Sequence, residues 1–232
     1  MIEFRLKSLK KKFHSLGIDG YVVPQNDEFF SEYSKNDRLK IISNFSGSAG
    51  YAVILKDKNY LFVDGRYTLQ AQLESGKYFK IIDLSKIRNC NLFKNKNLGI
   101  DPKIFTFNQI SSFFLKNNKI KEIKDNLIDK IKKKNLSFSK PFFSLNKDIA
   151  GEDYKKKIKK VSKIIKNQSS KYLFVSAPEN VAWLLNIRGF DNPTSPIPNC
   201  RLLLIDDEKF LIISEKNNLS KIIKEKKISY KQ

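Results

Sequence analysis

The sequence has few of the residues on which disulfide frameworks, metal sites and catalytic triads depend. It holds two cysteines, Cys90 and Cys200, and one histidine, His14, among 232 residues. Two cysteines give no disulfide framework and indicate a reducing compartment. Most transition-metal sites and nearly all triads need an imidazole, and we interpret His14, which follows a lysine run, as a solvated surface residue. The composition therefore argues against a self-contained metallohydrolase or Ser-His-Asp enzyme.

Long hydrophobic runs are also lacking. No apolar stretch approaches the roughly 18 residues that a membrane span requires. The first five residues include an acid and alternate charged with apolar side chains, which is unlike a signal peptide. With 41% hydrophobic and 12% aromatic residues, the chain can still form a sizeable core. We expect a soluble, cytoplasmic protein with no membrane partner.

Arginine is scarce although the chain is strongly basic. The formal net charge is +21, yet only six of the 45 basic residues are arginine. Nucleic-acid sites favour arginine, which binds phosphate and guanine with two parallel hydrogen bonds. The lysines at 155–157, 159 and 160 fall between apolar residues at helical spacing, and we interpret them as a solvated helix face. We predict generic, salt-sensitive polyanion binding and no specific nucleic-acid partner.

Hydrophobic periodicity predicts an α/β fold in the first part of the chain. Strands and helices alternate, and a β-hairpin lies near the middle. The predicted helical segments are 2–16, a short piece at 26–33, 67–74, 85–93 and 107–117. The predicted strands are 20–24, 51–55, 60–63, 79–83, 97–101 and 120–123.

The second part of the chain repeats the order helix, strand, helix, loop and hairpin, which implies two related domains. Its predicted elements are a helix at 152–167, a strand at 171–176, a helix after Pro178, a hairpin at 201–205 and 209–213, a helix at 219–226 and a strand at 228–230. We place the first domain at 1–135, a lysine- and serine-rich linker at 136–150 and the second domain at 151–232. Because the second copy is shorter, we expect it to be truncated at Gln232.

Three clusters stand out from the lysine background. The small-residue run Asn44-Phe45-Ser46-Gly47-Ser48-Ala49-Gly50 precedes a strand and lacks the Lys-Ser/Thr of a P-loop, so it favours a structural loop over a phosphate cradle. Asp64-Gly65-Arg66-Tyr67 follows a strand and opens a helix, where α/β folds place sites; Arg66 could bind a ligand or simply pair with Asp64. In the stretch 176–189, Trp183 and its apolar neighbours indicate core packing.

Together these clusters resemble the aminopeptidase P (Xaa-Pro aminopeptidase) branch of the creatinase/prolidase family. The resemblance covers nearly the whole chain and rests on 44–50, 63–71, 99–102, 150–151 and 177–189 in the family's order. It implies two creatinase-type N-terminal domains, each a mixed sheet flanked by helices, the second incomplete here. It also implies a further C-terminal catalytic domain that holds two divalent metals, usually manganese, on two Asp, one His and two Glu.

On this reading the chain is the non-catalytic N-terminal portion of an Xaa-Pro aminopeptidase. It would serve oligomer contacts, as in a dimer, and gate access of proline-containing peptides, with Arg66 contacting the bound peptide. The chain itself would hold no cofactor and be inactive alone. Two motifs depart from the family: its Trp-x-x-Arg-Pro is replaced by Ile131-Lys132-Lys133-Lys134, and its Asp-Ile-Pro by Asp191-Asn192-Pro193. The alternative is a free-standing creatinase-type module that binds a small ligand and has no peptidase activity.

Overall fold

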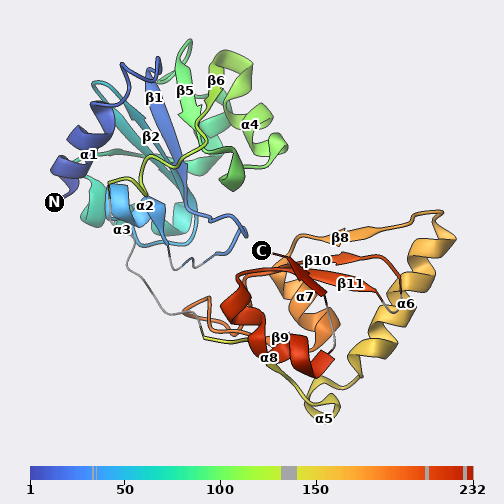
Figure 1. Cartoon of the computed structure of the whole chain (residues 1–232). Helices are drawn as coiled ribbons and strands as arrows, with labels where there is room; N and C mark the ends of the chain where they lie inside the picture. The colour runs from blue at the N-terminus through green and yellow to red at the C-terminus, as the bar shows by residue number, and fades with distance from the viewer. Residues whose placement is uncertain (33, 35, 132–139, 207–208, 227–228, 232) are drawn as a thin grey trace. The chain divides into compact units, whose positions relative to one another are not determined.

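The computed structural model describes residues 1–32, 34, 36–131, 140–206, 209–226 and 229–231. The chain forms two compact units, unit 1 at 1–135 and unit 2 at 136–232 (Figure 1). Part of the predicted linker, 136–139, and the predicted hairpin-turn residues 207–208 lie outside the described residues. The rest of the predicted linker contains the short elements β7 (Phe143–Ser144) and α5 (Lys147–Ala150).

Unit 1 is built on a six-stranded mixed sheet with the strand order β4-β3-β2-β1-β5-β6. The two central pairings, β1–β2 and β2–β3, are antiparallel. The strands β5 and β4 pair in parallel with β1 and β3, and β6 pairs in parallel with β5. The strands lie close to their predicted places: β1 (Gly20–Pro24), β2 (Gly50–Leu55), β3 (Asn59–Val63), β4 (Lys80–Asp83), β5 (Asn97–Ile100) and β6 (Lys119–Glu122).

Both faces of the unit 1 sheet are buried. β1 and β2 are buried at every position, so side chains pointing to either face need a covering layer. One layer holds α1 (Ile2–Lys10), α2 (Arg38–Ser43) and α3 (Thr68–Ser75), and α4 (Phe107–Phe113) lies on the opposite side (Figure 1). The 3-10 turns η2 (Leu84–Asn89), η3 (Pro102–Ile104) and η4 (Leu115–Asn117) accompany α4.

Three predicted helical segments of unit 1 are wrong in extent or type. The helix predicted at 2–16 ends at Lys10. From there the chain continues in tighter turns up to Gly17, whose φ is +59°. The piece predicted at 26–33 is not helical in its described part: Asp27 Oδ1 accepts hydrogen bonds from the N–H groups of Phe29 and Ser31. A local side-chain acceptor of this kind replaces helical pairing. The segment 85–93 contains only η2.

Unit 2 has a four-stranded sheet in the order β12-β11-β10-β8 and a separate β7–β9 pair. Its strands are β8 (Leu173–Val175), β9 (Ile187–Arg188), β10 (Arg201–Leu204), β11 (Phe210–Ile213) and β12 (Ser229–Lys231). The helices α6 (Tyr154–Asn167), α7 (Pro178–Leu185) and α8 (Lys216–Lys226) all contribute to one core cluster. The predicted α/β class, with two related units of mixed sheet and helices, is confirmed.

Two side chains of unit 2 lie where the periodicity did not place them. Trp183, predicted in the core, is 58% exposed. Lys157, predicted on the solvated face of α6, is buried, and its ammonium donates to the carbonyl of Trp183 at 2.9 Å and to Asn186 Oδ1 at 2.7 Å. Burial lowers the pKa of Lys157. Helix α7 ends before the predicted Gly189, because Asn186 adopts the left-handed conformation that closes a helix.

The substitution Gly50→Ala tests how tightly the hairpin of β2 and β3 packs in unit 1. A Cβ at this position would lie 2.8 Å from the carbonyl oxygen of Phe62 on the paired strand. This oxygen belongs to the backbone of the sheet and cannot move aside as a flexible side chain could. We expect Gly50→Ala to lower the free energy of unfolding of unit 1 by about 1–3 kcal/mol in urea titrations. The control is Gly65→Ala, whose Cβ would meet nothing closer than Asp83 at 3.4 Å. Equal stability of the two variants would contradict this packing.

Candidate functional site

Arg66 lies where β3 gives way to helix at one end of the unit 1 sheet. β3 ends at Val63, and the 3-10 turn η1 (Gly65–Tyr67) leads directly into α3. Asp64 caps this turn, because its Oδ1 accepts a hydrogen bond from the Arg66 N–H at 3.0 Å. The cap fixes the backbone that carries Arg66 and turns its side chain away from the filled core.

The Arg66 guanidinium is exposed and held by one neighbour. Its side chain is 73% exposed, and its Nε donates to Asp64 Oδ1 at 2.8 Å, with a longer contact of 3.4 Å from Nη2 to Oδ2. The guanidinium carbon lies 5.5 Å from the centroid of the Tyr67 ring. Within the described part of the chain, Nη1 makes no hydrogen bond. The ion pair with Asp64 foreseen from sequence is therefore present, and it leaves one edge of the guanidinium available.

The electrostatics of this pair keep both groups charged. Hydrogen bonds from the side chain and then from the backbone N–H of Arg66 hold the pKa of Asp64 below its usual value. The Asp64 carboxylate in turn raises the pKa of Arg66. Because one pKa falls and the other rises, no pH in the physiological range neutralises either group. Arg66 is thus a permanent, oriented cation whose free edge suits a carboxylate or a peptide carbonyl.

The small-residue loop 44–50 packs against the same turn. A Cβ on Gly47 would lie 3.0 Å from Tyr67 Cγ and would also collide with the Phe45 ring, so only glycine fits there. Glu74 on α3 accepts hydrogen bonds from the N–H and the hydroxyl of Ser46, at 2.8 and 2.7 Å. The structure therefore joins the first two sequence clusters into one substructure, in which the loop serves packing.

A short polar chain connects this substructure to the segment after β1. The Ser48 hydroxyl lies 2.9 Å from the Tyr67 hydroxyl and donates to Glu32 Oε1 at 2.9 Å. The side chain of Gln25, directly after β1, donates to the carbonyl of Glu32. Tyr67 is thereby fixed at its hydroxyl, and its ring cannot swing away from Arg66 without breaking these contacts. Sequence reasoning did not identify Ser48 or Glu32 as part of the site.

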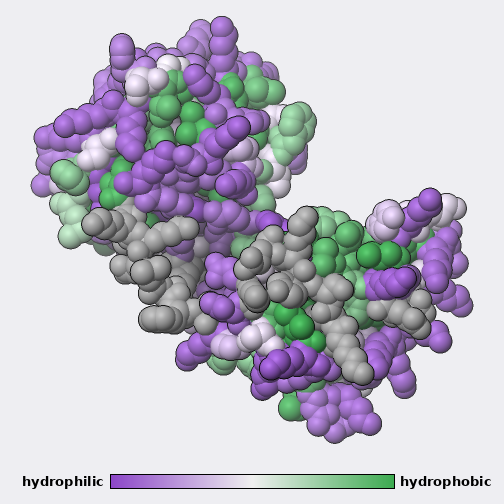
Figure 2. Space-filling view, in the orientation of Figure 1, coloured by the Kyte–Doolittle hydropathy of each residue, from purple (hydrophilic) through white to green (hydrophobic). Residues whose placement is uncertain are grey.

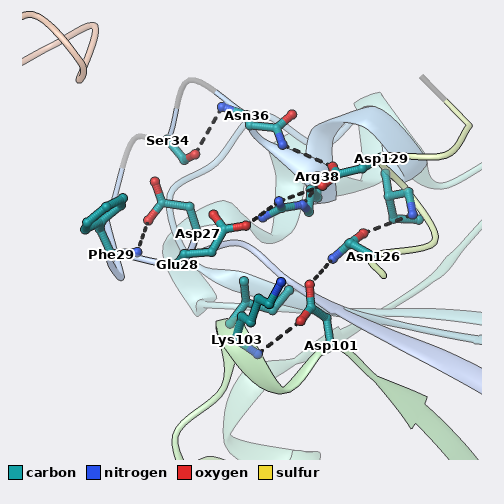
Figure 3. A network of polar contacts seen from close by, with 12 residues as sticks. Asp27, Glu28, Phe29, Ser34, Asn36, Arg38, Asp101, Lys103, Asn126 and Asp129 are labelled. Atoms are coloured by element: carbon teal, nitrogen blue, oxygen red, sulfur yellow. Dashed lines mark hydrogen bonds and ion pairs between the residues drawn. The ribbon is translucent and has the colours of Figure 1, made fainter. Parts of the chain in front are cut away.

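A buried arginine, also missed from sequence, anchors the segment that carries Glu32. The side chain of Arg38 is 4% exposed, and its guanidinium makes a two-point contact with Asp129 at 2.8 and 2.9 Å and a third with Glu28 at 2.6 Å (Figure 3). These carboxylates raise the pKa of Arg38 despite its desolvation. The sequence offers one indication of this role: arginine is rare in this chain, and Arg38 directly follows the helix cap Asp37.

Asp129 belongs to a segment that is itself fixed at a second point. Asn126 donates from Nδ2 to the buried Asp101 at 2.9 Å, and its own Oδ1 accepts from the N–H of Ile128 (Figure 3). The network therefore ties together the end of β5, the segment 125–131 and the start of α2. Arg38, Asp101 and Asn126 are buried, Glu28 and Asp129 are partly buried, and each is hydrogen-bonded to another member, which is the geometry of a structural clamp.

The described residues contain no group of three or more His, Cys, Asp or Glu that could hold a metal ion. His14 is exposed in the turns that follow α1. The donor set of two Asp, one His and two Glu expected from the resemblance therefore does not fit this part of the chain. None of the described helices is long and apolar enough to cross a membrane.

Family models match both units. The description "Creatinase/Prolidase N-terminal domain" applies to the model that matches residues 5–131 and to a second one that matches residues 133–232. Two matched stretches of this kind agree with the duplication seen in the order of strands and helices.

Curated relatives are considerably longer than this chain. It is 34% identical to "Probable Xaa-Pro aminopeptidase P" of Coprinopsis cinerea over 91% of its own length and 37% of the relative, and 31% identical to "Xaa-Pro aminopeptidase 1" of Dictyostelium discoideum over 94% and 38%. The match lies in the N-terminal portion of these relatives.

A solved structure shares the fold. X-prolyl aminopeptidase from Caenorhabditis elegans, described as a cytosolic enzyme with a di-nuclear active site, is similar to 99% of this chain and to 42% of its own, with a TM-score of 0.85 at 24% sequence identity. At this identity the similarity shows the arrangement of the polypeptide alone.

Arg38→Leu tests whether the buried network is structural. The change would leave Glu28 and Asp129 without their shared cation, so we expect a loss of about 2–3 kcal/mol in the free energy of unfolding of unit 1. Arg38→Lys should recover only part of this, because an ammonium cannot bond both oxygens of Asp129 in one plane. Arg66→Leu is the exposed control, and its urea midpoint should not move. A stable Arg38→Leu protein would refute the clamp.

Proposed function

The chain belongs to the creatinase/prolidase N-terminal domain family, and from that premise we propose that it is the non-catalytic N-terminal portion of a metal-dependent Xaa-Pro aminopeptidase. The parent reaction is release of an N-terminal residue that precedes proline. The two divalent metals, manganese by family resemblance, and the groups that activate water would come from the catalytic portion. The role of this chain is to bind and admit the peptide and to form subunit contacts in the cytoplasm.

The exposed guanidinium of Arg66 carries the substrate-binding part of the proposal. Asp64 orients it, Tyr67 supports it, and Nη1 remains available at the end of the sheet. A peptide offers carbonyl oxygens and a terminal carboxylate, which are the acceptors that a planar, permanently charged guanidinium binds best. Arg66 would act as a peptide-binding residue that gates entry to the catalytic portion.

The oligomer contacts would involve α3, the helix that follows Arg66. Leu69 and Leu73 lie one turn apart on this helix, and both are strongly exposed. Exposed apolar side chains at i and i+4 form a continuous stripe, which a partner subunit would remove from water. A homodimer that buries this stripe would place Arg66 beside the subunit boundary.

Arg66→Ala tests the substrate role in a fusion of this chain with the polypeptide that follows the matched region in the Coprinopsis cinerea relative. We expect kcat/KM on an Xaa-Pro peptide to fall by about tenfold or more, since a charge-assisted hydrogen bond contributes roughly 1.5–3 kcal/mol. The melting temperature should not change, because the side chain is exposed.

The matched control for this experiment is Arg88→Ala, which removes another exposed arginine of unit 1 that lies over the Phe113 ring. The control should keep the parent kcat/KM. Unchanged kinetics for Arg66→Ala, or an equal loss in both variants, would show that Arg66 has no specific contact with the peptide.

The chain by itself should not hydrolyse peptides. Purified protein incubated with an Xaa-Pro peptide and added Mn²⁺ should release no amino acid, and equilibrium dialysis should detect no tight Mn²⁺ binding, since the described residues offer no ligand cluster. The fusion above serves as the positive control. Turnover that copurifies with the chain through several orthogonal columns would overturn the non-catalytic assignment.

A further inference from the structure

Exposed cations are common on unit 1, and exposure alone does not distinguish Arg66. The face of this unit visible in Figure 2 is largely hydrophilic, and most of its described lysines are exposed. Arg66 is instead held from two directions. Asp64 accepts a hydrogen bond from its Nε, and the ring of Tyr67 has its centroid 5.5 Å from the guanidinium carbon. The orientation of this cation therefore depends on two other side chains.

Asp64 by itself fixes only one edge of the guanidinium. The bond from Nε to Asp64 Oδ1 is short, at 2.8 Å, whereas the contact from Nη2 to Oδ2 is 3.4 Å and correspondingly weaker. A planar group held mainly at one point can still pivot about that point. The Tyr67 ring lies within the roughly 6 Å at which a cation and an aromatic face attract each other, and it limits this pivot. The direction of Nη1 thus depends on where the Tyr67 ring lies.

The Tyr67 ring is held by the loop 44–50 on its other sides. Phe45 packs against it edge to face, with ring centroids 5.9 Å apart. The backbone of Gly47 approaches so closely that a Cβ there would lie 3.0 Å from Tyr67 Cγ. At the far end of the ring, the hydroxyl lies 2.9 Å from the hydroxyl of Ser48. Packing therefore fixes the body of the side chain, and one hydrogen bond fixes its tip.

The direction of that hydrogen bond follows from the next residue along. Ser48 is buried and donates its single hydroxyl proton to Glu32 Oε1 at 2.9 Å, because a carboxylate can only accept. Ser48 Oγ must then be the acceptor for the Tyr67 hydroxyl. A chain of hydrogen bonds that ends on a charge strengthens each of its members. The pKa of Arg66 is raised chiefly by Asp64 and to a smaller extent by Glu32, so the end of the chain lies within electrostatic reach of the guanidinium.

We propose that Tyr67 and Ser48 are positioning residues for Arg66. The hydrogen bonds from Tyr67 to Ser48 and from Ser48 to Glu32 hold the ring, and the ring fixes the plane of the guanidinium and the direction in which Nη1 meets an acceptor. A donor that is oriented beforehand loses less conformational entropy when it binds. The consequence for a peptide rests on the proposed function, whereas the consequence for the mobility of Arg66 does not.

Side-chain ¹⁵N relaxation of the Arg66 Nε–H group in the 232-residue chain tests the positioning without any ligand. The chain has six arginines, and the Arg66 signal is identified by its loss in Arg66→Ala. Tyr67→Phe keeps the ring and removes only the hydroxyl. We expect it to lower the order parameter of this group by about 0.2 or more, which is the difference between a rigid and a flexible group. Ser48→Ala, the second variant, should have the same effect because it removes the acceptor.

Tyr78→Phe is the matched control. Tyr78 is also a half-buried tyrosine of unit 1 with a cation over its ring, the Lys77 ammonium at 5.5 Å from the centroid, but its hydroxyl makes no hydrogen bond among the described residues. The control should leave the order parameter of Arg66 unchanged. An equal loss of order in Tyr78→Phe, or an Arg66 that stays ordered in both Tyr67→Phe and Ser48→Ala, would overturn the proposal.

A double-mutant cycle in the fusion with the Coprinopsis cinerea polypeptide tests the consequence for the peptide. Tyr67→Phe should lower kcat/KM by about threefold or more, and it should cause no further loss when Arg66 is already alanine. A loss of the same size without Arg66 would show that Tyr67 acts by another route and would overturn the proposal. Parent kinetics in Arg66→Ala, together with a loosened Arg66 in Tyr67→Phe, would contradict the proposed function alone.

Discussion

The structure of unit 1 depends on one constraint, which is that both faces of its central strands are apolar. β1 and β2 are buried along their whole length, and neighbouring residues such as Val22 and Val23 belong to different core clusters. A sheet of this kind is stable only between two covering layers. The helices on one side and the chain from 84 to 118 on the other meet this requirement, and apolar side chains form a core cluster on each face.

Polar chemistry is therefore displaced to the ends of the strands. Asp64 and Arg66 follow the last residue of β3, and the loop that precedes β2 packs against the same turn. Two arginines have opposite surroundings in this arrangement: Arg38 and its two carboxylates hold the segment that bears Glu32, whereas Arg66, for which we propose a substrate contact, stays exposed. The buried charge of Arg38 is held by its two carboxylate partners, whereas the exposed charge of Arg66 remains able to bind another group.

Most strands could be predicted from the sequence, because alternation and turn residues act locally. The same periodicity failed where a single polar contact decided the outcome. Asp27 accepts hydrogen bonds from two nearby backbone N–H groups and forms a turn where a helix was expected. Lys157 is buried because Asn186 Oδ1 and a backbone carbonyl accept hydrogen bonds from its ammonium. The position of Arg66 was visible in the chain order, whereas the link of the neighbouring Tyr67 to Ser48 and Glu32 required segments distant in sequence to come together.

The choice of arginine over lysine supports this division of roles. In a chain with 39 lysines, the six arginines are exceptions, and their described contacts are directional. Arg38 grips Asp129 with two nitrogens, and Arg188 bonds two backbone carbonyls through Nη1. A lysine ammonium could supply the charge in these places but not the planar geometry. Arg66 follows the same rule, because its Nε donates a hydrogen bond to Asp64 and thereby orients a guanidinium that is exposed. In an arginine oriented in this way Nη1 can donate to a further acceptor, and this is the observation on which the proposed contact with a peptide rests.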